Sequence, residues 1–118
     1  MKYNEENIIL KLSYEFALAI IEYAEILEEY KKYIIARQIL KSGTSIGANI
    51  KEAQNAESKS DFIHKIKIAA KEVDETEYWL ELCRDSKNYH FDQTLLDKLI
   101  IIKKIINKII STSKKPIS

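Results

Sequence analysis

Residues that end or bend helices are almost absent from this chain. Glycine and proline together occupy three of its 118 positions, while isoleucine alone occupies 21. Turns depend on glycine and proline, so a chain this poor in them must form a few long elements, and long elements of this kind are helices. A chain of this length can build one hydrophobic core without disulfides or metals. We therefore expect a single all-α domain over residues 1–118.

Four segments of the sequence carry helical patterns. They are expected at about residues 4–30, 32–57, 60–84 and 92–111. Asn4, Ser58 or Ser60, and Asp92 stand at the starts of three of them, where such side chains accept hydrogen bonds from the free amides of a first helical turn. Because the connections are short, the sequence predicts an up-down-up-down antiparallel four-helix bundle. The tail is expected to fray, since Pro116 cannot continue a helix.

Apolar residues recur at three- and four-residue steps in each segment, which predicts the side that faces the core. The positions are Ile8, Leu12, Phe16, Ala19, Tyr23, Ile26 and Tyr30; Ile35, Ile39, Ile46, Ile50 and Ala53; Phe62, Ile66, Ala69, Val73 and Leu80; and Leu95, Leu99, Ile102, Ile105, Ile106, Ile109 and Ile110. In the last segment Leu96, Ile100 and Ile101 fall outside that side, widening the apolar surface to roughly 200° against the usual ~100°. Surplus apolar surface is commonly buried against another subunit, so we expect a homo-oligomer.

The cysteine content and the hydropathy point to a compartment. Cys83 is the single cysteine, so no internal disulfide can form, which is typical of the reducing cytoplasm. The first residues include Glu5 and Glu6 rather than the apolar stretch of a secretory signal. The most apolar run, residues 99–110, contains three lysines and is shorter than the ~20 apolar residues of a membrane span. The sequence predicts a soluble cytoplasmic protein with no membrane partner.

Charge alternates in sign along the chain. Residues 1–30 carry a net −5, residues 31–60 +4, residues 61–90 −2 and residues 91–118 +4, for a formal net charge of +1. Opposite charges on neighbouring helices attract, so pairing and solvation explain most of this pattern. The alternative is that the basic segments bind phosphate, although nucleic-acid-binding domains usually carry a larger positive charge. The candidates for phosphate contact are Lys41, Lys51, Lys103, Lys104 and Lys108.

A polar stripe follows the core side of the second segment. Its members are three or four residues apart: Gln38, Lys41, Ser45, Asn49 and Glu52. Gly43 and Gly47 each cost about 0.5–1 kcal/mol in a helix interior, which indicates that another helix backbone approaches closely and supports the expected oligomer. The third segment has a comparable stripe, with Ile68, Glu72, Trp79 and Cys83. The candidates for interhelical or intersubunit contact are Gln38, Ser45, Asn49, Glu52, Glu72, Glu75 and Trp79.

The same positions carry a resemblance to a known family. Ser-Ile-x-x-Asn-Ile-x-Glu runs from Ser45 to Glu52, and Glu-x-x-Glu-Thr-x-Tyr-Trp-Leu runs from Glu72 to Leu80. With Gln38 and a basic residue upstream, these motifs resemble those of the four-helix-bundle family encoded by intervening sequences in bacterial 23S ribosomal RNA genes. Lysine stands at position 41 in place of the more typical arginine, and alanine at position 53 where many relatives place glycine.

The resemblance covers nearly the whole chain and carries expectations beyond the fold. It implies a left-handed four-helix bundle that assembles as a ring-like homopentamer. Relatives include the accessory protein of diversity-generating retroelements, which resembles a basic pentamer that binds nucleic acid and a reverse transcriptase. On this resemblance, RNA or DNA is the leading partner besides further copies of the chain.

Two patterns typical of enzymes lack the context they need. Residues 43–47 fit the G-x-S-x-G nucleophile elbow, but that elbow follows a strand, and no segment here predicts one. Asp61-x-x-His64 with Glu72 and Glu75 shares residue types with dimetal bundles, which need two Glu-x-x-His pairs and two further glutamates, and His64 lies opposite the core side. We therefore expect no catalytic residues, no metal, no cofactor and no small-molecule substrate.

These inferences lead to one functional prediction and one alternative. The chain is expected to be a non-enzymatic, oligomeric four-helix bundle that binds nucleic acid or a nucleoprotein complex. The alternative is a structural or protein-adaptor oligomer without affinity for nucleic acid. Binding to structured RNA or duplex DNA that weakens steeply with salt would separate the two, because phosphate contacts release counterions.

Overall fold

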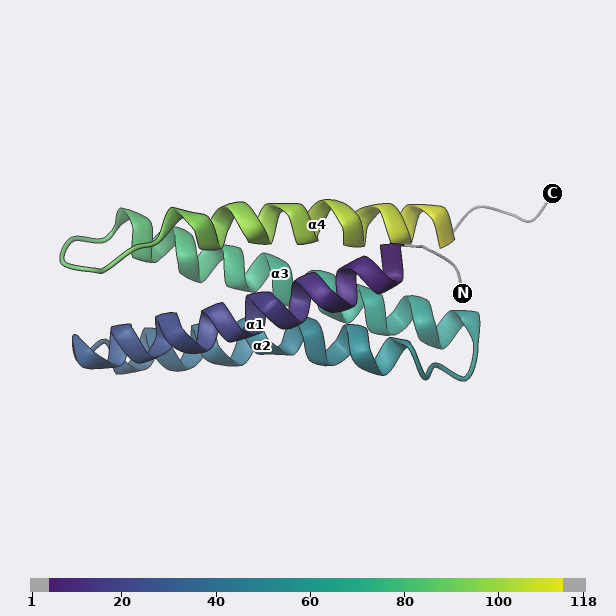
Figure 1. The fold of residues 1–118 in the computed structure, drawn as a ribbon, viewed down its shortest axis with the longest axis horizontal. Helices are drawn as coiled ribbons and strands as arrows, with labels where there is room; N and C mark the ends of the chain where they lie inside the picture. Colours follow the sequence, from purple (N-terminus) through teal and green to yellow (C-terminus); the bar gives the residue numbers. More distant parts are fainter. Residues whose placement is uncertain (1–4, 114–118) are drawn as a thin grey trace.

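Four helices in sequence make up the described part of the chain, residues 5–113 of a computed structural model (Figure 1). They are α1 (Glu5–Glu29), α2 (Tyr33–Ala53), α3 (Lys59–Asp85) and α4 (Gln93–Ser113), with no strand among the described residues. Each helix packs against its neighbours in sequence and α4 packs against α1, whereas the backbones of the diagonal pairs α1–α3 and α2–α4 are farther apart, with no two described Cα atoms within 8 Å. The molecule measures 22 Å in both directions across its long axis. The prediction of an all-α four-helix bundle is confirmed.

Local side-chain and backbone contacts set the helix ends. Ser58 Oγ accepts a hydrogen bond from the amide of Asp61 at 3.0 Å, and Asp92 Oδ1 accepts one from the amide of Thr94 at 3.0 Å. The predicted caps of α3 and α4 are therefore confirmed. The second helix ends at Ala53 rather than near residue 57, because the next three amides bond to carbonyls three residues back, in tight turns. The predicted cap at residue 4 lies outside the described residues. The last helix continues to Ser113, two residues beyond its predicted end, and the rest of the predicted fraying tail lies outside the described residues.

The α1–α2 connection is a tight turn built without glycine. The amide of Lys31 donates to the carbonyl of Glu28 at 2.9 Å, and the amide of Lys32 donates to the carbonyl of Leu27 at 2.8 Å. This pair of bonds forms a Schellman motif, in which the residue after the helix takes a left-handed conformation. Lys31 has a φ of 65°, which strains an L-residue but not glycine. The turn reverses the chain and makes α1 and α2 antiparallel neighbours.

The buried side of α1 differs from the predicted stripe. Phe16 is buried as predicted, but Ile8 is 52% exposed and Tyr30 is 58% exposed. The buried positions on α1 are Ile9, Ser13, Phe16, Ile20, Tyr23, Ala24 and Leu27. The shift arises at Ser13, which a hydrophobic pattern does not count because serine is polar. Its hydroxyl donates a hydrogen bond to the carbonyl of Leu10 at 3.2 Å, which allows the residue to be buried. On α4, Leu96 is also buried, contrary to the prediction.

Gly43 and Gly47 bring α2 into close contact with α1. A Cβ added at Gly43 would lie 2.8 Å from Cγ2 of Ile20, and one added at Gly47 would lie 3.3 Å from the carbonyl oxygen of Ser13. A side chain at Gly43 would therefore push the two helices apart. The predicted close approach is confirmed, but the approaching backbone belongs to the same chain. The glycine pair consequently gives no support to an oligomer.

A pair of buried hydroxyl groups joins α2 to α3. Thr76 Oγ1 and Ser42 Oγ share a hydrogen bond of 2.9 Å, and both residues are fully buried. Thr76 Oγ1 also lies 2.7 Å from the carbonyl oxygen of Glu72. Buried hydroxyls cost free energy unless they are hydrogen-bonded, so this pair fixes how α2 and α3 meet. Thr76 is the threonine of the Glu-x-x-Glu-Thr motif, whereas no sequence pattern singled out Ser42.

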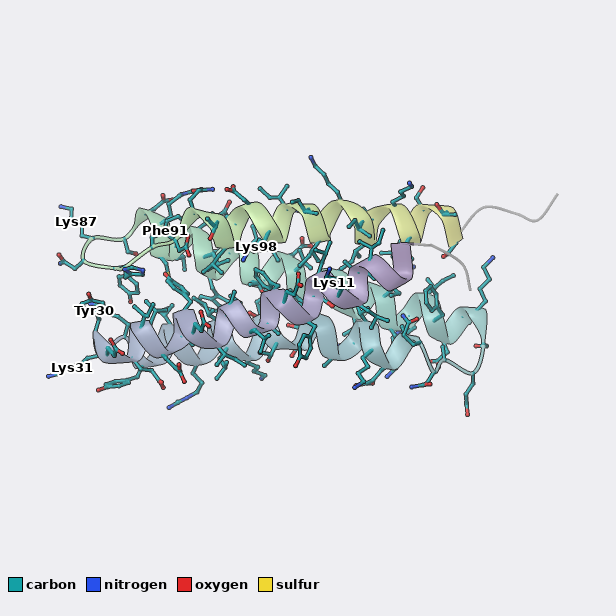
Figure 2. All side chains as sticks on the ribbon, in the orientation of Figure 1. Lys11, Tyr30, Lys31, Lys87, Phe91 and Lys98 are labelled. Carbon is teal, nitrogen blue, oxygen red and sulfur yellow. The ribbon has the colours of Figure 1, made fainter. Side chains whose placement is uncertain are left out.

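The loop between α3 and α4 is held against α1 at one end of the bundle. Tyr23 Oη donates to the carbonyl of His90 at 2.6 Å, and the ammonium of Lys32 lies 4.8 Å from the centre of the Tyr89 ring. Burial raises the pKa of the Tyr23 hydroxyl and also that of the neighbouring Cys83 thiol. Figure 2 shows the turn residues Tyr30 and Lys31 at the same end as this loop.

Candidate interaction surfaces

The helices α2 and α3 bring the predicted contact residues together on one side of the bundle. The Ser42–Thr76 hydrogen bond and an ion pair of 3.0 Å between Lys65 Nζ and Glu52 Oε1 fix an antiparallel register between these helices. That register places the polar stripe of α2 beside the polar stripe of α3. We call this surface the α2–α3 face; it consists of Gln38, Ser45, Asn49, Glu52, Glu72, Glu75 and Trp79.

Most polar groups of the α2–α3 face bond within their own helix. Ser45 Oγ donates to the carbonyl of Lys41 at 2.7 Å, and Asn49 Nδ2 donates to the carbonyl of Ser45 at 2.9 Å. Among the predicted contact residues, Glu52 makes an interhelical bond, to Lys65. Contact of the other members with a second subunit stays a prediction. Ser45 lies in the middle of a continuous helix, so the G-x-S-x-G pattern is no nucleophile elbow.

The α3 side of this face is acidic and carries the tryptophan. Trp79 is partly exposed, its Nε1 donates to Glu75 Oε2 at 3.4 Å, and its ring meets that of Tyr78 edge-on at 5.3 Å. Burial and the nearby charge of Glu75 raise the pKa of the Glu72 carboxyl, while Lys41 acts in the opposite direction. No cation lies within ion-pair distance of Glu72 or Glu75 among the described residues. This acidic pair is therefore available to a partner.

The five candidate lysines do not form one surface. Lys103 Nζ lies 2.9 Å from Glu77 Oε1 and 3.6 Å from Asp74 Oδ1, and the hydrogen bond with Glu77 raises the pKa of this ammonium. Its charge is matched across the α3–α4 seam, as the alternation of charge predicts. The other four are exposed: Lys41 and Lys51 on α2, Lys104 and Lys108 on α4. Because α2 and α4 are diagonal, one chain holds two separate basic helices.

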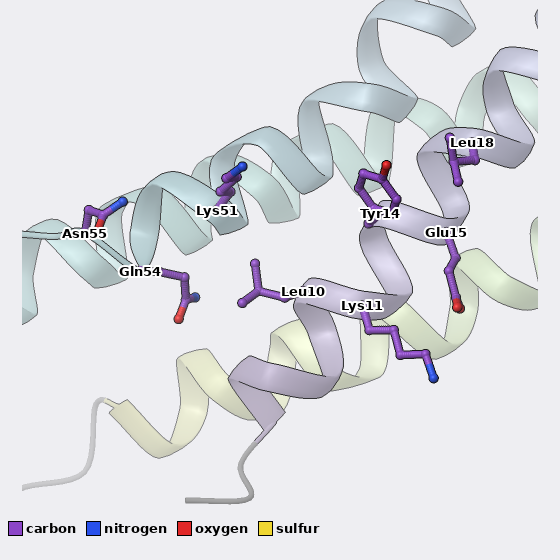
Figure 3. Close-up of a pocket in the computed structure, with 8 residues that line it drawn as sticks. All are labelled: Leu10, Lys11, Tyr14, Glu15, Leu18, Lys51, Gln54 and Asn55. Carbon is purple, nitrogen blue, oxygen red and sulfur yellow. The ribbon is translucent and has the colours of Figure 1, made fainter. Parts of the chain in front are cut away.

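A groove between α1 and α2 is a surface that the motifs did not reveal. It has a volume of about 720 Å³ and opens where the start of α1 diverges from the end of α2 (Figure 3). Its lining consists of Leu10, Lys11, Tyr14, Glu15, Leu18, Lys51, Gln54 and Asn55. Leu10, Tyr14, Leu18 and Ile21 are spaced by four, four and three residues, a second apolar stripe on α1 that could have signalled it. We call the stripe, the groove and the exposed Leu40 the α1–α2 face.

The apolar surplus predicted for the last helix is smaller than expected. Leu96 is buried in the core, which leaves Ile100 and Ile101 exposed. A step of one residue turns a helix by about 100°, so these two side chains lie on different sides of α4 and form no common patch. The exposed apolar side chains of the α1–α2 face are more numerous and adjoin one another. The larger exposed apolar surface therefore lies on α1 and not on α4.

The described residues contain neither a cluster of metal ligands nor a helix that could span a membrane. Between residues 5 and 113, no group of three or more histidine, cysteine, aspartate or glutamate side chains could hold a metal ion. His64 is exposed, as predicted. Over the same range, no helix has the length and hydrophobicity to cross a membrane.

Comparison with known proteins gives a family and a structural relative. The sequence profile of the 23S rRNA-intervening sequence proteins matches residues 5–109. A crystal structure of a protein of unknown function, from the S23 ribosomal protein family of Bacteroides thetaiotaomicron, is 42% identical with a TM-score of 0.84. That match covers 91% of this chain and 98% of the other. Curated proteins give no match. Neither of the two descriptions names an enzymatic activity.

Proposed function

This chain belongs to the family of 23S rRNA-intervening sequence proteins, and on that premise we propose that it is a non-enzymatic oligomer that binds nucleic acid or a nucleoprotein complex. It acts in the cytoplasm, as a ring of several copies, five by the resemblance described above. One copy offers few phosphate contacts, and a ring repeats each of them, which multiplies a weak affinity.

The charge of α4 supports this proposal most directly. The helix carries four lysines against one carboxylate, that of Asp97. Lys104 and Lys108 are exposed and lie one helical turn apart, away from the buried side. Lysines spaced in this way can bind successive phosphates of a nucleic-acid backbone. Lys104 and Lys108 are therefore the leading contacts, with Lys41 and Lys51 of α2 as a second set.

Fluorescence anisotropy with labelled structured RNA and duplex DNA tests the proposal. Binding should weaken steeply between roughly 50 and 200 mM salt, because each phosphate contact releases counterions. The double variant Lys104→Gln/Lys108→Gln should lower the slope of log K against log salt by about two for each copy that contacts the nucleic acid. The matched control is Lys59→Gln/Lys87→Gln, which removes the same charge from exposed positions outside α4. An equal loss of nucleic-acid affinity in both variants would show that only net charge matters and would contradict the assignment of the phosphate contacts to α4.

The apolar α1–α2 face favours a second candidate function. Leu18 is 48% exposed and Tyr14 66% exposed beside the groove, and exposed apolar side chains that adjoin one another commonly mark a protein interface. A structural or protein-adaptor oligomer would use such faces and bind no nucleic acid. Absence of binding at both salt concentrations would support this alternative over the first.

A further inference from the structure

The two faces that flank α2 have complementary surfaces. The α1–α2 face is apolar along Tyr14 and Leu18, and its groove is lined by the two cations Lys11 and Lys51 and by one carboxylate, that of Glu15. Neither lysine has an ion-pair partner among the described residues. The α2–α3 face is acidic at Glu72 and Glu75, because no cation of the described residues lies within ion-pair distance of either carboxylate and Lys41 acts on Glu72 only from beyond that distance. One face can therefore satisfy charges that the other leaves unmatched.

The shape of the bundle relates these faces to a closed assembly. The bundle is equally wide in both lateral directions, so faces that share the helix α2 stand roughly perpendicular to each other. In a ring, each copy meets its two neighbours in directions about 90° apart for four copies and about 108° apart for five. Contacts through opposite faces of the bundle would instead continue as an open chain. Adjacent complementary faces are the arrangement that closes into a small ring.

We propose that each copy docks the α1–α2 face onto the α2–α3 face of the next copy and so closes a ring, with α2 toward the axis and α4 on the outside. This inference rests on the oligomer of the proposed function and names its interface. The partner of both faces is thus a second copy of this chain. The raised pKa of Glu72 fits the same arrangement, because a cation of the next copy would lower it again.

The ring also decides which lysines face outward. Lys104 and Lys108 of α4 would form an outer belt, where a long nucleic acid can reach several copies at once. Lys41 of α2 would lie near the axis, where access is narrower. The nucleic-acid contacts of the proposed function would therefore come from α4, although the candidate lysines are divided between both helices.

The mass of the assembly in light scattering tests the interface with one variant for each face. Leu18→Glu places a charge in the α1–α2 face, and Ser45→Arg places a large cation in the α2–α3 face. Both positions have partly exposed side chains, so circular dichroism should show folded protein. The matched control is Ile101→Glu on α4, because Ile101 is 52% exposed and Leu18 is 48% exposed. Wild type and control should have four or five times the 13.8 kDa of one chain, and each face variant should be a monomer.

Mixing the two face variants gives the sharper result. Each variant keeps the face that the other has lost, so an equal mixture can form one intact contact and no ring. The mixture should therefore contain a dimer of twice 13.8 kDa. A monomeric mixture, a ring that survives Leu18→Glu, or a ring lost in Ile101→Glu would overturn this interface.

The two proposals can fail separately. Lys104→Gln/Lys108→Gln leaves both faces intact, so a ring that binds no nucleic acid would refute only the nucleic-acid function. An oligomer that Leu18→Glu and Ser45→Arg leave intact would refute only the interface. A wild-type monomer would refute the interface and the oligomer of the proposed function together.

Discussion

Replacing Gly43 with alanine should destabilise this protein, although alanine favours helices. The new Cβ would lie 2.8 Å from Cγ2 and 2.9 Å from Cγ1 of Ile20, where carbon atoms prefer roughly 3.5–4.0 Å. Ile20 is fully buried, and as a β-branched residue in a helix it has one strongly preferred rotamer, so it cannot turn away. Overpacking of this kind costs about 1–3 kcal/mol, and alanine regains about 1 kcal/mol of helix propensity. The difference between the two terms gives an expected net loss of up to about 2 kcal/mol.

A double-mutant cycle with Ile20→Ala tests the physical reason. Ile20→Ala alone should cost about 2–5 kcal/mol, because it leaves a cavity in the core. In that background the nearest remaining atom of residue 20 is its Cβ, 3.3 Å from the added methyl group. Gly43→Ala should then be close to neutral or stabilising by up to about 1 kcal/mol. The two changes should therefore couple by about 1–3 kcal/mol, which is the overpacking cost that Ile20→Ala removes.

Urea unfolding followed by circular dichroism measures these differences. All variants should be compared at one protein concentration, because association changes apparent stability. Gly47→Ala is the control: its Cβ would lie 3.3 Å from the Ser13 carbonyl oxygen, and its three nearest atoms all belong to Ser13. Its effect should add to that of Ile20→Ala within about 0.5 kcal/mol. A Gly43→Ala protein that is more stable than wild type, or equally destabilised with and without Ile20→Ala, would refute the close-packing argument.

Three further predictions concern single contacts. Lys31→Gly should stabilise the protein by about 1 kcal/mol in urea unfolding, because glycine adopts the left-handed conformation at this position without steric strain. A lower urea midpoint would contradict the Schellman turn. Thr76→Val should cost about 1–3 kcal/mol by leaving the buried hydroxyl of Ser42 without its partner, and adding Ser42→Ala should recover part of this loss; no recovery would count against the pair. Asp92 accepts hydrogen bonds from the hydroxyl and amide of Thr94, which hold its pKa below the usual range. The folded pKa is thus below the unfolded one, so this stabilisation is present above the unfolded pKa and lost as pH falls through the folded pKa. The stability difference between wild type and Asp92→Ala should shrink from about pH 7 to about pH 2. A constant difference would contradict a stabilising role of the ionised Asp92 carboxylate.

Several features of the candidate surfaces could be predicted because they depend on spacing along one helix. Ser45 and Asn49 lie on the predicted polar side of α2, since residues three or four apart share a helix side. The charge alternation correctly indicated ion pairs across seams, as between Lys103 and Glu77. Which lysine a seam would use could not be read from the pattern, because that depends on the register of two helices.

The sequence by itself determined the local features of this protein. The four helices, the caps at Ser58 and Asp92, and the glycine positions where a backbone could approach all depend on residues within a turn or two of one another. Each of these features was present in the order and spacing of the residues.

Only the tertiary structure decided how the helices face one another. It buried Ser13 and Leu96, joined Ser42 to Thr76, and set α2 and α4 diagonally, so that the candidate lysines are divided. These outcomes depend on contacts between residues far apart in sequence, and a small rotation of one helix about its axis changes which side chains are buried. A hydrophobic pattern gives that rotation only to within about one residue, or about 100°. The close packing of α1 against the glycines of α2 then fixes how these two helices are rotated against each other.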